Sequence, residues 1–357
     1  GIFWGVMLNL SLSASSLGLS LNEIGGGIAT GILLSAIATV LIAMLNLVSW
    51  VQRIFTPMVS SVYLFLLSFQ LIFIFFEGML GKKADGTLDI PVSLLSVFIV
   101  IFVILLKIKG NPFISNFSIL IGIVAGWILY VLLFPGEATS AKLNGGSFTM
   151  FPLGKPNLEI GIIIVTFFAG LLNMSNTVAS IDSAARIFNE NTKPFQYRKS
   201  MFLTGIYSIF ASGFGLVPYT PFTSTIGFLQ STRIYDRKPF YLGGALLTLM
   251  GLIPVFGSFL ATMPITIGNA VLLVSYLQLF GTAYSSLNGI TFTSNTIFRL
   301  AIPLLFGVSL MNLPVGIYSS LPTLIQPFIS NGLIMGMLLS IIFELTIKWE
   351  RMEQIEG

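Results

Sequence analysis

Long apolar stretches recur along the chain, and short polar segments separate them. Each stretch approaches the ~20 residues that an α-helix needs to cross the hydrocarbon core of a bilayer. Twelve spans are predicted, near 3–20, 24–46, 56–80, 90–107, 113–134, 159–186, 199–213, 216–233, 239–260, 264–286, 295–312 and 321–347. No polar segment is long enough to join soluble domains. The pattern therefore predicts one all-α, polytopic membrane domain over residues 1–357.

Two segments depart from the pattern of a continuous spanning helix. The second of them, residues 213–227, contains Pro218 and Pro221, which lack the backbone N–H of a regular helix. We expect extended backbone up to about Thr220 and a half-helix from about Pro221 to Arg233. The first, residues 5–20, is rich in serine. Paired broken segments indicate the substrate site of a transporter, because non-helical backbone is tolerated at membrane depth only inside protein or beside a cavity.

Composition supports a membrane environment and narrows the chemistry. The chain is 55% hydrophobic and only 8% charged, whereas soluble domains carry about 25% charged residues. It has no Cys and no His, so thiol chemistry and imidazole-based catalysis or metal binding are excluded. Serine without His lacks its usual base, and we predict no enzyme, no metal site and no cofactor.

The basic residues predict the topology. Four of the 17 Lys and Arg residues, namely Lys82, Lys83, Lys142 and Lys155, fall in the alternate loops assigned to the outside, and the rest fall inside. The C-terminal tail, 348–357, is then cytoplasmic. Because no basic patch forms, nucleic acid is not an expected partner. The compact loops favour a bacterial plasma membrane. The chain opens on Gly1, and we expect earlier spans to precede it.

A polar stripe lies inside the predicted span 159–186. Asn173 and Thr177 are four residues apart and share a helix face, which Ser180 continues. The stripe has two readings, interhelical hydrogen bonding or a binding site facing a cavity. The predicted half-helix offers a second polar group at its N-terminus, where hydroxyls either cap the helix or hold a small polar ligand. These hydroxyls belong to Thr223, Ser224 and Thr225.

The carboxylates are expected at less central places. Asp182 follows Asn173 by nine residues and so faces away from the stripe, where an ion pair with Arg186 is favoured over a role in coupling. Glu77, Glu159 and Glu344 lie near span ends and are expected to be interfacial.

The run Gly227-Phe-Leu-Gln-Ser-Thr232-Arg233 resembles the second half of the signature of the nucleobase–ascorbate transporters, or xanthine/uracil permeases. That signature reads Gln, Glu or Pro, then Asn, one residue, Gly, four residues, Thr, and Arg, Lys or Gly. The segments 184–186 and 198–201 resemble the family's link between its eighth and ninth spans. The resemblance covers nearly the whole chain, from within the family's third span.

The resemblance implies fourteen spans in two inverted repeats of seven, with core and gate subdomains. The first repeat would retain about 1–134 and the second about 157–347. It also implies that spans three and ten each pair a short strand with a half-helix around the substrate. The implied substrate-binding residues are Asn173, Thr177, Phe222, Thr223, Ser224 and Thr225, with Trp4 approaching from the opposite half-helix.

Two departures bear on coupling. Ser224 and Thr225 stand at the first two signature positions, and Asn173, Asn176 and Thr177 stand where the family usually has a Glu-containing pattern. Neutral groups thus replace both usual acids, although Asn can still pair with the amide edges of a base. Coupling to H⁺ or Na⁺ and facilitated diffusion all stay open.

The leading hypothesis is alternating-access transport of a nucleobase such as uracil, xanthine or another purine. One alternative keeps the fold and carries an anion such as sulfate or bicarbonate, because helix N-termini suit anions. An alternative of another class is a channel or an intramembrane enzyme. A homodimer is compatible with all of them.

Overall fold

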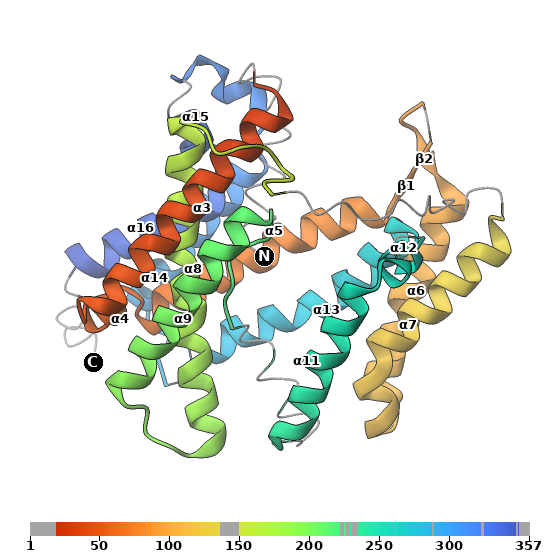
Figure 1. The fold of residues 1–357 in the computed structure, drawn as a ribbon, viewed down its shortest axis with the longest axis horizontal. Coiled ribbons are helices and arrows are strands. Elements are labelled where there is room, and N and C mark those ends of the chain that lie inside the picture. The colour runs from red at the N-terminus through yellow and green to blue at the C-terminus, as the bar shows by residue number, and fades with distance from the viewer. Residues whose placement is uncertain are drawn as a thin grey trace. The chain divides into compact units, whose positions relative to one another are not determined.

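The computed structural model of this chain describes residues 19–83, 85–135, 150–221, 225, 229, 235–260, 262–287, 289–322, 325–347 and 349. Within these ranges the chain is mainly helical (Figure 1). Nearly all of the predicted first span, most of the predicted half-helix and the tail from 350 onward lie outside the described residues.

Seven helices are long and apolar enough to cross a membrane, counted over the described residues. They are α3 (Leu21–Met44), α5 (Pro57–Met79), α6 (Ile90–Lys109), α7 (Pro112–Leu133), α8 (Ile160–Phe188), α13 (Ile265–Ser285) and α14 (Ser294–Met311). A less apolar helix, α9 (Pro194–Gly213), follows α8. The predicted all-α, polytopic fold is thereby confirmed.

The remaining elements are shorter. They are α4 (Val48–Ile54), α11 (Arg237–Leu252), α12 (Pro254–Leu260), α15 (Gln326–Ile329), α16 (Gly332–Thr346), a 3₁₀ turn η1 (Val315–Ser320), and a hairpin of β1 (Gly81–Lys82) with β2 (Leu88–Asp89). The hairpin is antiparallel, with Gly81 opposite Asp89.

Two predicted spans are interrupted in the structure. The stretch 239–260 divides at Ile253, because Pro254 has no N–H to continue α11 and begins α12 instead. The stretch 321–347 contains the single turn α15 and then α16, which starts where the Asn331 side chain accepts a hydrogen bond from Ile334 N at 3.1 Å. Each was predicted as one continuous helix, which was wrong.

Local capping accounts for where several helices begin. Ser20 and Glu23 form a reciprocal capping box at the start of α3. Asp89 accepts from Val92 N at 3.2 Å to start α6, and Asn111 accepts from Ile114 N at 2.9 Å to start α7. Proline stands in the first turn of both α6 and α7, where its missing N–H costs nothing.

The chain divides into two compact units that interleave along the sequence. Unit 1 comprises Gly1–Gln70, Thr149–Ile226 and Leu279–Gly357, and unit 2 comprises Leu71–Phe148 and Gly227–Gln278. Each unit therefore draws on both predicted repeats. The assignment of the two repeats themselves stays a prediction.

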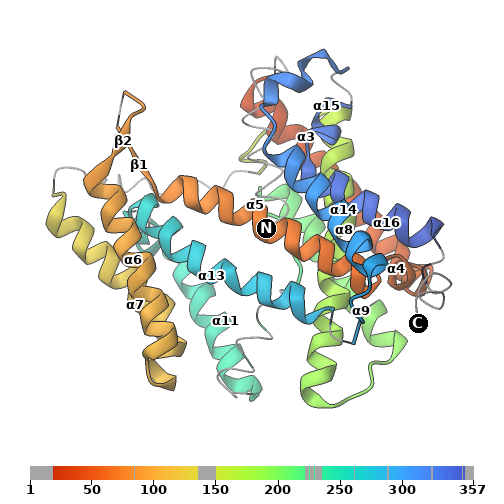
Figure 2. The same cartoon turned by 180° about the vertical axis from the view of Figure 1, so that it is seen from behind.

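Unit 1 is built on two helix packings. In the first, α3 lies beside α8 and α9 (Figure 1). In the second, α14 lies beside α16, as the view from behind shows (Figure 2). One apolar cluster joins α3, α4, α8 and α9, and it includes Val51, Met174, Val178 and Met201. This packing holds the middle of α8 inside the unit.

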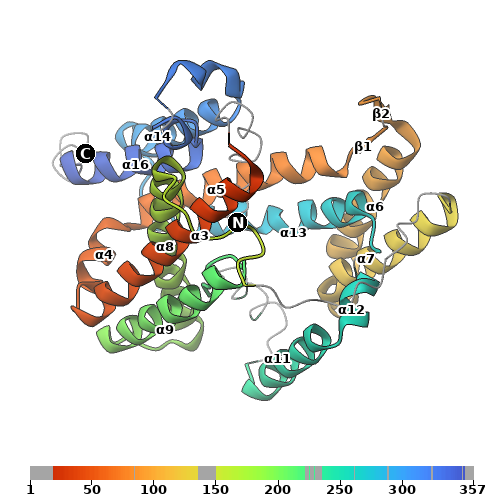
Figure 3. The ribbon, with the colours of Figure 1, turned by 45° about the horizontal axis from the view of Figure 1, so that its top comes forward.

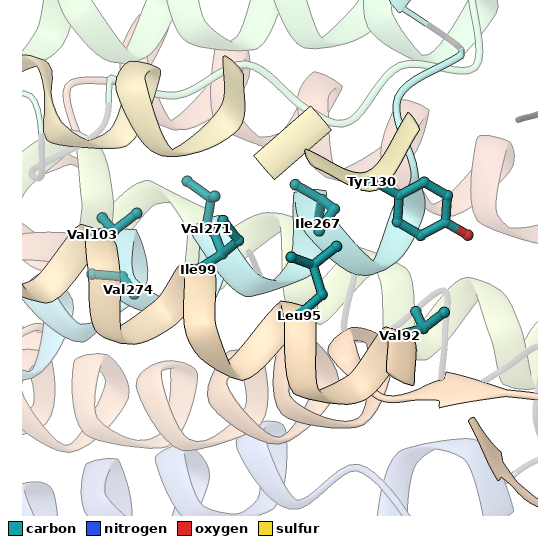
Figure 4. Packing of buried hydrophobic residues seen from close by; sticks show 8 residues of the cluster. All are labelled: Val92, Leu95, Ile99, Val103, Tyr130, Ile267, Val271 and Val274. Atoms are coloured by element: carbon teal, nitrogen blue, oxygen red, sulfur yellow. The ribbon is translucent and has the colours of Figure 1, made fainter. Parts of the chain in front are cut away.

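Unit 2 has an apolar core between α6, α7 and α13. Helices α6 and α7 lie side by side (Figure 3). Along α6 the buried residues follow helical spacing, and they pack against α13 and against Tyr130 of α7 (Figure 4). The cluster comprises Val92, Leu95, Ile99, Val103, Tyr130, Ile267, Val271 and Val274.

Candidate functional site

The middle of α8 carries a dense set of buried polar side chains. Up to Leu172 the helix is apolar except for Thr166, and then hydroxyl and amide side chains take buried positions. The buried members are Asn173, Ser175, Asn176, Thr177 and Ser180, each less than 9% exposed. A polar group buried in a membrane protein needs partners, because lipid supplies none. The hydrogen bonds of this set therefore define the site.

One part of the set reaches helix α5. The side-chain nitrogen of Asn176 donates to the Tyr63 hydroxyl oxygen at 3.0 Å and to Asn173 Oδ1 at 3.3 Å. Tyr63 is only 1% exposed, and Asn173 and Asn176 are 7% and 8% exposed. A continuous string of polar groups thus runs from α5 across the face of α8.

Another part of the set reaches the proline-containing stretch after α9. Residues 216–221 have no regular secondary structure, which confirms that the helix is broken here, while their extended backbone stays a prediction. The Thr177 and Thr220 hydroxyl oxygens lie 3.4 Å apart, and the Ser180 hydroxyl donates to the Pro221 carbonyl at 2.9 Å. The non-helical backbone is therefore held against the polar face of α8.

Helix geometry places Asn173 between the side of α8 that contacts Tyr63 and the side that contacts Thr220. At about 100° per residue, Asn176 is rotated roughly 60° to one side of Asn173 and Thr177 roughly 40° to the other. Tyr63 bounds the first side and Thr220 the second. A small polar ligand in front of Asn173 would meet amide and hydroxyl groups from three separate segments.

Comparisons with known proteins indicate the class of protein in which such a site occurs. A model described as a permease family, that of the xanthine/uracil permeases, matches residues 2–316. The chain belongs to the xanthine/uracil permease family.

Individual relatives agree with this assignment. The chain is 26% identical to YwdJ of Bacillus subtilis (strain 168), over 98% of this chain and 82% of that protein. It is 21% identical to the uric acid transporter UacT of Escherichia coli (strain K12), over 83% of this chain and 62% of UacT. It is 23% identical to the xanthine permease XanQ of the same organism, over 84% of this chain and 66% of XanQ. This permease is thus a multi-pass membrane protein of a nucleobase transporter family, with a small molecule as its substrate.

Three of the predicted site residues lie in the described part of the permease. Asn173 and Thr177 are buried on the polar face of α8, which confirms that they share one face. Thr225 has helical backbone and an exposed side chain. The others lie outside the described residues, and their roles stay predictions: Trp4, Phe222, Thr223, Ser224, Gly227, Thr232 and Arg233.

Two residues of the site were not predicted from the sequence. Tyr63 is a polar residue within the otherwise apolar stretch Val62–Leu67 of α5, and that placement inside a span was the available signal. Thr220 was assigned to the extended stretch but not to the site. Their partners are 113 and 43 residues away in sequence, and no local pattern reports contacts at that separation.

A cleft of about 1030 Å³ opens in unit 1 of the permease beyond the polar face. Val178, Ala179 and Asp182 of α8 form part of its lining, together with Arg53 and Phe55. The Asp182 carboxylate accepts a hydrogen bond from the Tyr197 hydroxyl, which also lies 3.1 Å from Thr192 Oγ1. The predicted partner, Arg186, has a side chain outside the described set. None of the five buried polar residues in the middle of α8 is among the described residues that line this cleft.

A buried ion pair stands behind one wall of the cleft. Arg299 of α14 makes a two-point contact with the Glu344 carboxylate of α16, in which the Nη2–Oε2 distance is 2.6 Å. Thr56, which lines the cleft, donates to Glu344 Oε2 at 3.0 Å. The Glu344 side chain is 6% exposed, so it is buried in protein near the end of α16, and its position at the membrane interface stays a prediction. Arg299 supplies the compensating charge that allows a carboxylate to be buried there.

Proposed function

We propose that this permease carries a nucleobase across the plasma membrane by alternating access, and that the base binds at the Asn173 face of α8. The observation that carries the proposal is an unused hydrogen-bonding pair. No described residue hydrogen-bonds Asn173 Nδ2 or Asn176 Oδ1, and both side chains keep some exposure. A donor next to an acceptor complements the N–H and C=O groups along the edge of a base.

The relatives support a purine as the substrate. UacT is named for uric acid and XanQ for xanthine, and both bases are purines with amide edges. The family match supports the same class, and it ranks a base above the sulfate or bicarbonate alternative. The distribution of Lys and Arg supports a cytoplasmic C-terminus.

Coupling in this proposal does not use a carboxylate at the α8 polar face. Among the described residues of α8, the carboxylate is Asp182, about 13 Å along the helix from Asn173 at 1.5 Å per residue. Proton symport, sodium symport and facilitated diffusion predict different responses to imposed gradients, so the driving ion is part of the test.

The test is uptake into proteoliposomes containing the purified permease. Radiolabelled xanthine, uric acid, hypoxanthine, guanine, adenine and uracil are supplied in turn, with no gradient, a proton gradient or a sodium gradient. We expect saturable uptake of at least one purine, recovered chemically unchanged inside the vesicles. Uptake of sulfate but of no base, by protein that elutes as a single folded species, would overturn the proposal in favour of the anion alternative. Recovery of a modified base would indicate an enzyme.

A further inference from the structure

The hydrogen-bond inventory of the α8 polar face is more specific than a single donor–acceptor pair. Asn176 Nδ2 uses its two protons on Tyr63 Oη and Asn173 Oδ1. Three groups then remain without a described partner: the Asn173 amide protons, the Asn176 carbonyl oxygen and the Tyr63 hydroxyl proton.

The Asn176 amide stands between the other two groups, because its nitrogen is hydrogen-bonded to both Asn173 and Tyr63. From Asn173 through Asn176 to Tyr63, the three groups are thus a donor, an acceptor and a donor. A complementary ligand edge has an acceptor, a donor and an acceptor in the same order.

An imide has that edge, because it places one N–H between two carbonyls. Xanthine, uric acid and uracil each carry an imide. Hypoxanthine keeps one carbonyl and the N–H but has C–H in place of the second carbonyl. Guanine puts an amino group at that place, where it would face a donor, and adenine has no carbonyl.

We propose that Tyr63 is a specificity-determining residue of the permease, whose hydroxyl donates to the second carbonyl of an imide-bearing base. The proposal rests on the proposed function and names its substrate class. Tyr63 is 1% exposed, whereas Asn173 and Asn176 are 7% and 8% exposed. A base therefore approaches from the asparagine side and meets the hydroxyl in a dry setting. An unpaired or mismatched polar group is costly there, because water cannot replace the missing partner.

The expected difference in affinity between bases follows from the loss of one neutral hydrogen bond. Such a bond is worth about 3- to 10-fold in affinity, and an amino group facing a buried donor costs about 10- to 100-fold. Wild-type permease should thus prefer xanthine to hypoxanthine, and hypoxanthine to guanine.

The experiment measures inhibition constants for xanthine, hypoxanthine and guanine against labelled xanthine uptake, in wild type and Tyr63→Phe. We expect the ratio of hypoxanthine to xanthine constants to fall about 3- to 10-fold in Tyr63→Phe. Tyr318→Phe is the matched control, because Tyr318 is also buried but its hydroxyl donates to the Leu310 carbonyl at 3.3 Å. Its ratio should stay at the wild-type value. A purely structural effect of Tyr63 would weaken both bases equally and leave the ratio unchanged.

A ligand-side measurement keeps the test independent of whether the variant folds. In wild type, 1-methylxanthine blocks the imide N–H opposite Asn176 and should inhibit at least about 10-fold more weakly than xanthine. Equal inhibition by xanthine, guanine and 1-methylxanthine would overturn the imide assignment while base transport stands. An unchanged ratio in Tyr63→Phe would remove Tyr63 from the site. Absence of any base uptake by folded wild type would refute the proposed function itself.

Discussion

Helices α7 and α8 are both long enough to cross a bilayer, but they differ in what they bury. Over the most apolar window of each helix, 22% of α7 is buried and 67% of α8. The buried residues of α7 are Ser118, Gly122, Gly126 and Tyr130, each four residues after the last. That spacing forms one narrow packing stripe, and the rest of α7 is apolar surface suited to lipid.

The polar groups of the two helices are used differently. On α7 the Ser118 hydroxyl donates to the Ser115 carbonyl of its own helix at 2.8 Å. On α8 the amide of Asn176 and the hydroxyl of Ser180 bond to other segments of the chain. A buried polar group satisfied within its own helix needs no partner elsewhere, whereas polar groups that converge from several segments either hold helices together or form a binding site. The proposed function takes the second possibility for α8, and α7 then serves packing alone.

The largest expected effect tests that assignment directly. Asn173→Ala removes the free amide donor and the acceptor for Asn176 Nδ2. We expect uptake of the preferred base to fall by about 100-fold or more, because both a ligand contact and the orientation of Asn176 are lost. Ser118→Ala on α7 is the control and should keep uptake within about twofold of wild type, since its hydroxyl bonds only its own helix. Full uptake by Asn173→Ala, at wild-type expression and elution volume, would exclude Asn173 from the site.

Local features of the chain were readable from sequence, whereas long-range partners were not. The polar face of α8 followed from the four-residue spacing of Asn173 and Thr177, and the non-helical stretch followed from Pro218 and Pro221. Both depend only on backbone geometry and neighbouring residues. The hydrogen bond between Asn176 and Tyr63 depends on how α5 packs, which a periodic apolar pattern does not encode.

Glu344 shows the same limit. Its place near the end of an apolar run predicts a position near the membrane interface, but it does not predict that the side chain is buried against Arg299, 45 residues earlier. The stretch 239–260 differs, because the sequence itself contains the signal for the break, Pro254. The prediction of one continuous helix followed the surrounding apolar run instead.

Two ion pairs differ in burial in the same way as the two helices. Substitutions in them should give the next largest effect, a change in the free energy of unfolding. The side chains of Arg299 and Glu344 are 19% and 6% exposed, whereas those of Lys82 and Glu77 are 56% and 70% exposed. Glu344→Gln should destabilise the permease by about 3 kcal/mol, because it leaves a largely buried guanidinium without its counter-charge. Glu77→Gln should cost less than about 1 kcal/mol, because water screens the exposed pair.

Thermal unfolding in detergent, followed by circular dichroism, measures both changes on the same preparation. The cation–π contact of Arg299 with Trp349 remains in Glu344→Gln and offsets part of the loss. Similar destabilisation by the two substitutions would contradict the distinction between a buried and an exposed pair.

Two glycines of unit 2 test whether α7 is a packing helix, and substitutions at them should change the free energy of unfolding by a smaller amount. A Cβ atom at Gly122 of α7 would overlap Val103 Cγ2 of α6, whereas one at Gly243 of α11 meets nothing within 4 Å. Gly122→Ala should therefore destabilise by about 1–2 kcal/mol, as overpacking outweighs the gain in helix propensity. Gly243→Ala should be neutral or stabilising by up to about 1 kcal/mol, because only the propensity changes. The unfolding assay used for the ion pairs measures both variants. Destabilisation by Gly243→Ala equal to that by Gly122→Ala would mean that packing against α6 is not what requires glycine.

The smallest expected effect lies within α8 itself and compares two of its serines. The Ser180 hydroxyl donates to the Pro221 carbonyl, whereas the Ser175 hydroxyl donates at 2.6 Å to Leu172 in its own helix. Ser180→Ala should lower the initial rate of base uptake about 3- to 10-fold, because the extended stretch loses one anchor on the polar face. Ser175→Ala should change that rate less than twofold. Equal rates for the two variants would show that the contact between α8 and residues 216–221 orders the backbone without contributing to transport, and the site would then be confined to Asn173, Asn176 and Tyr63.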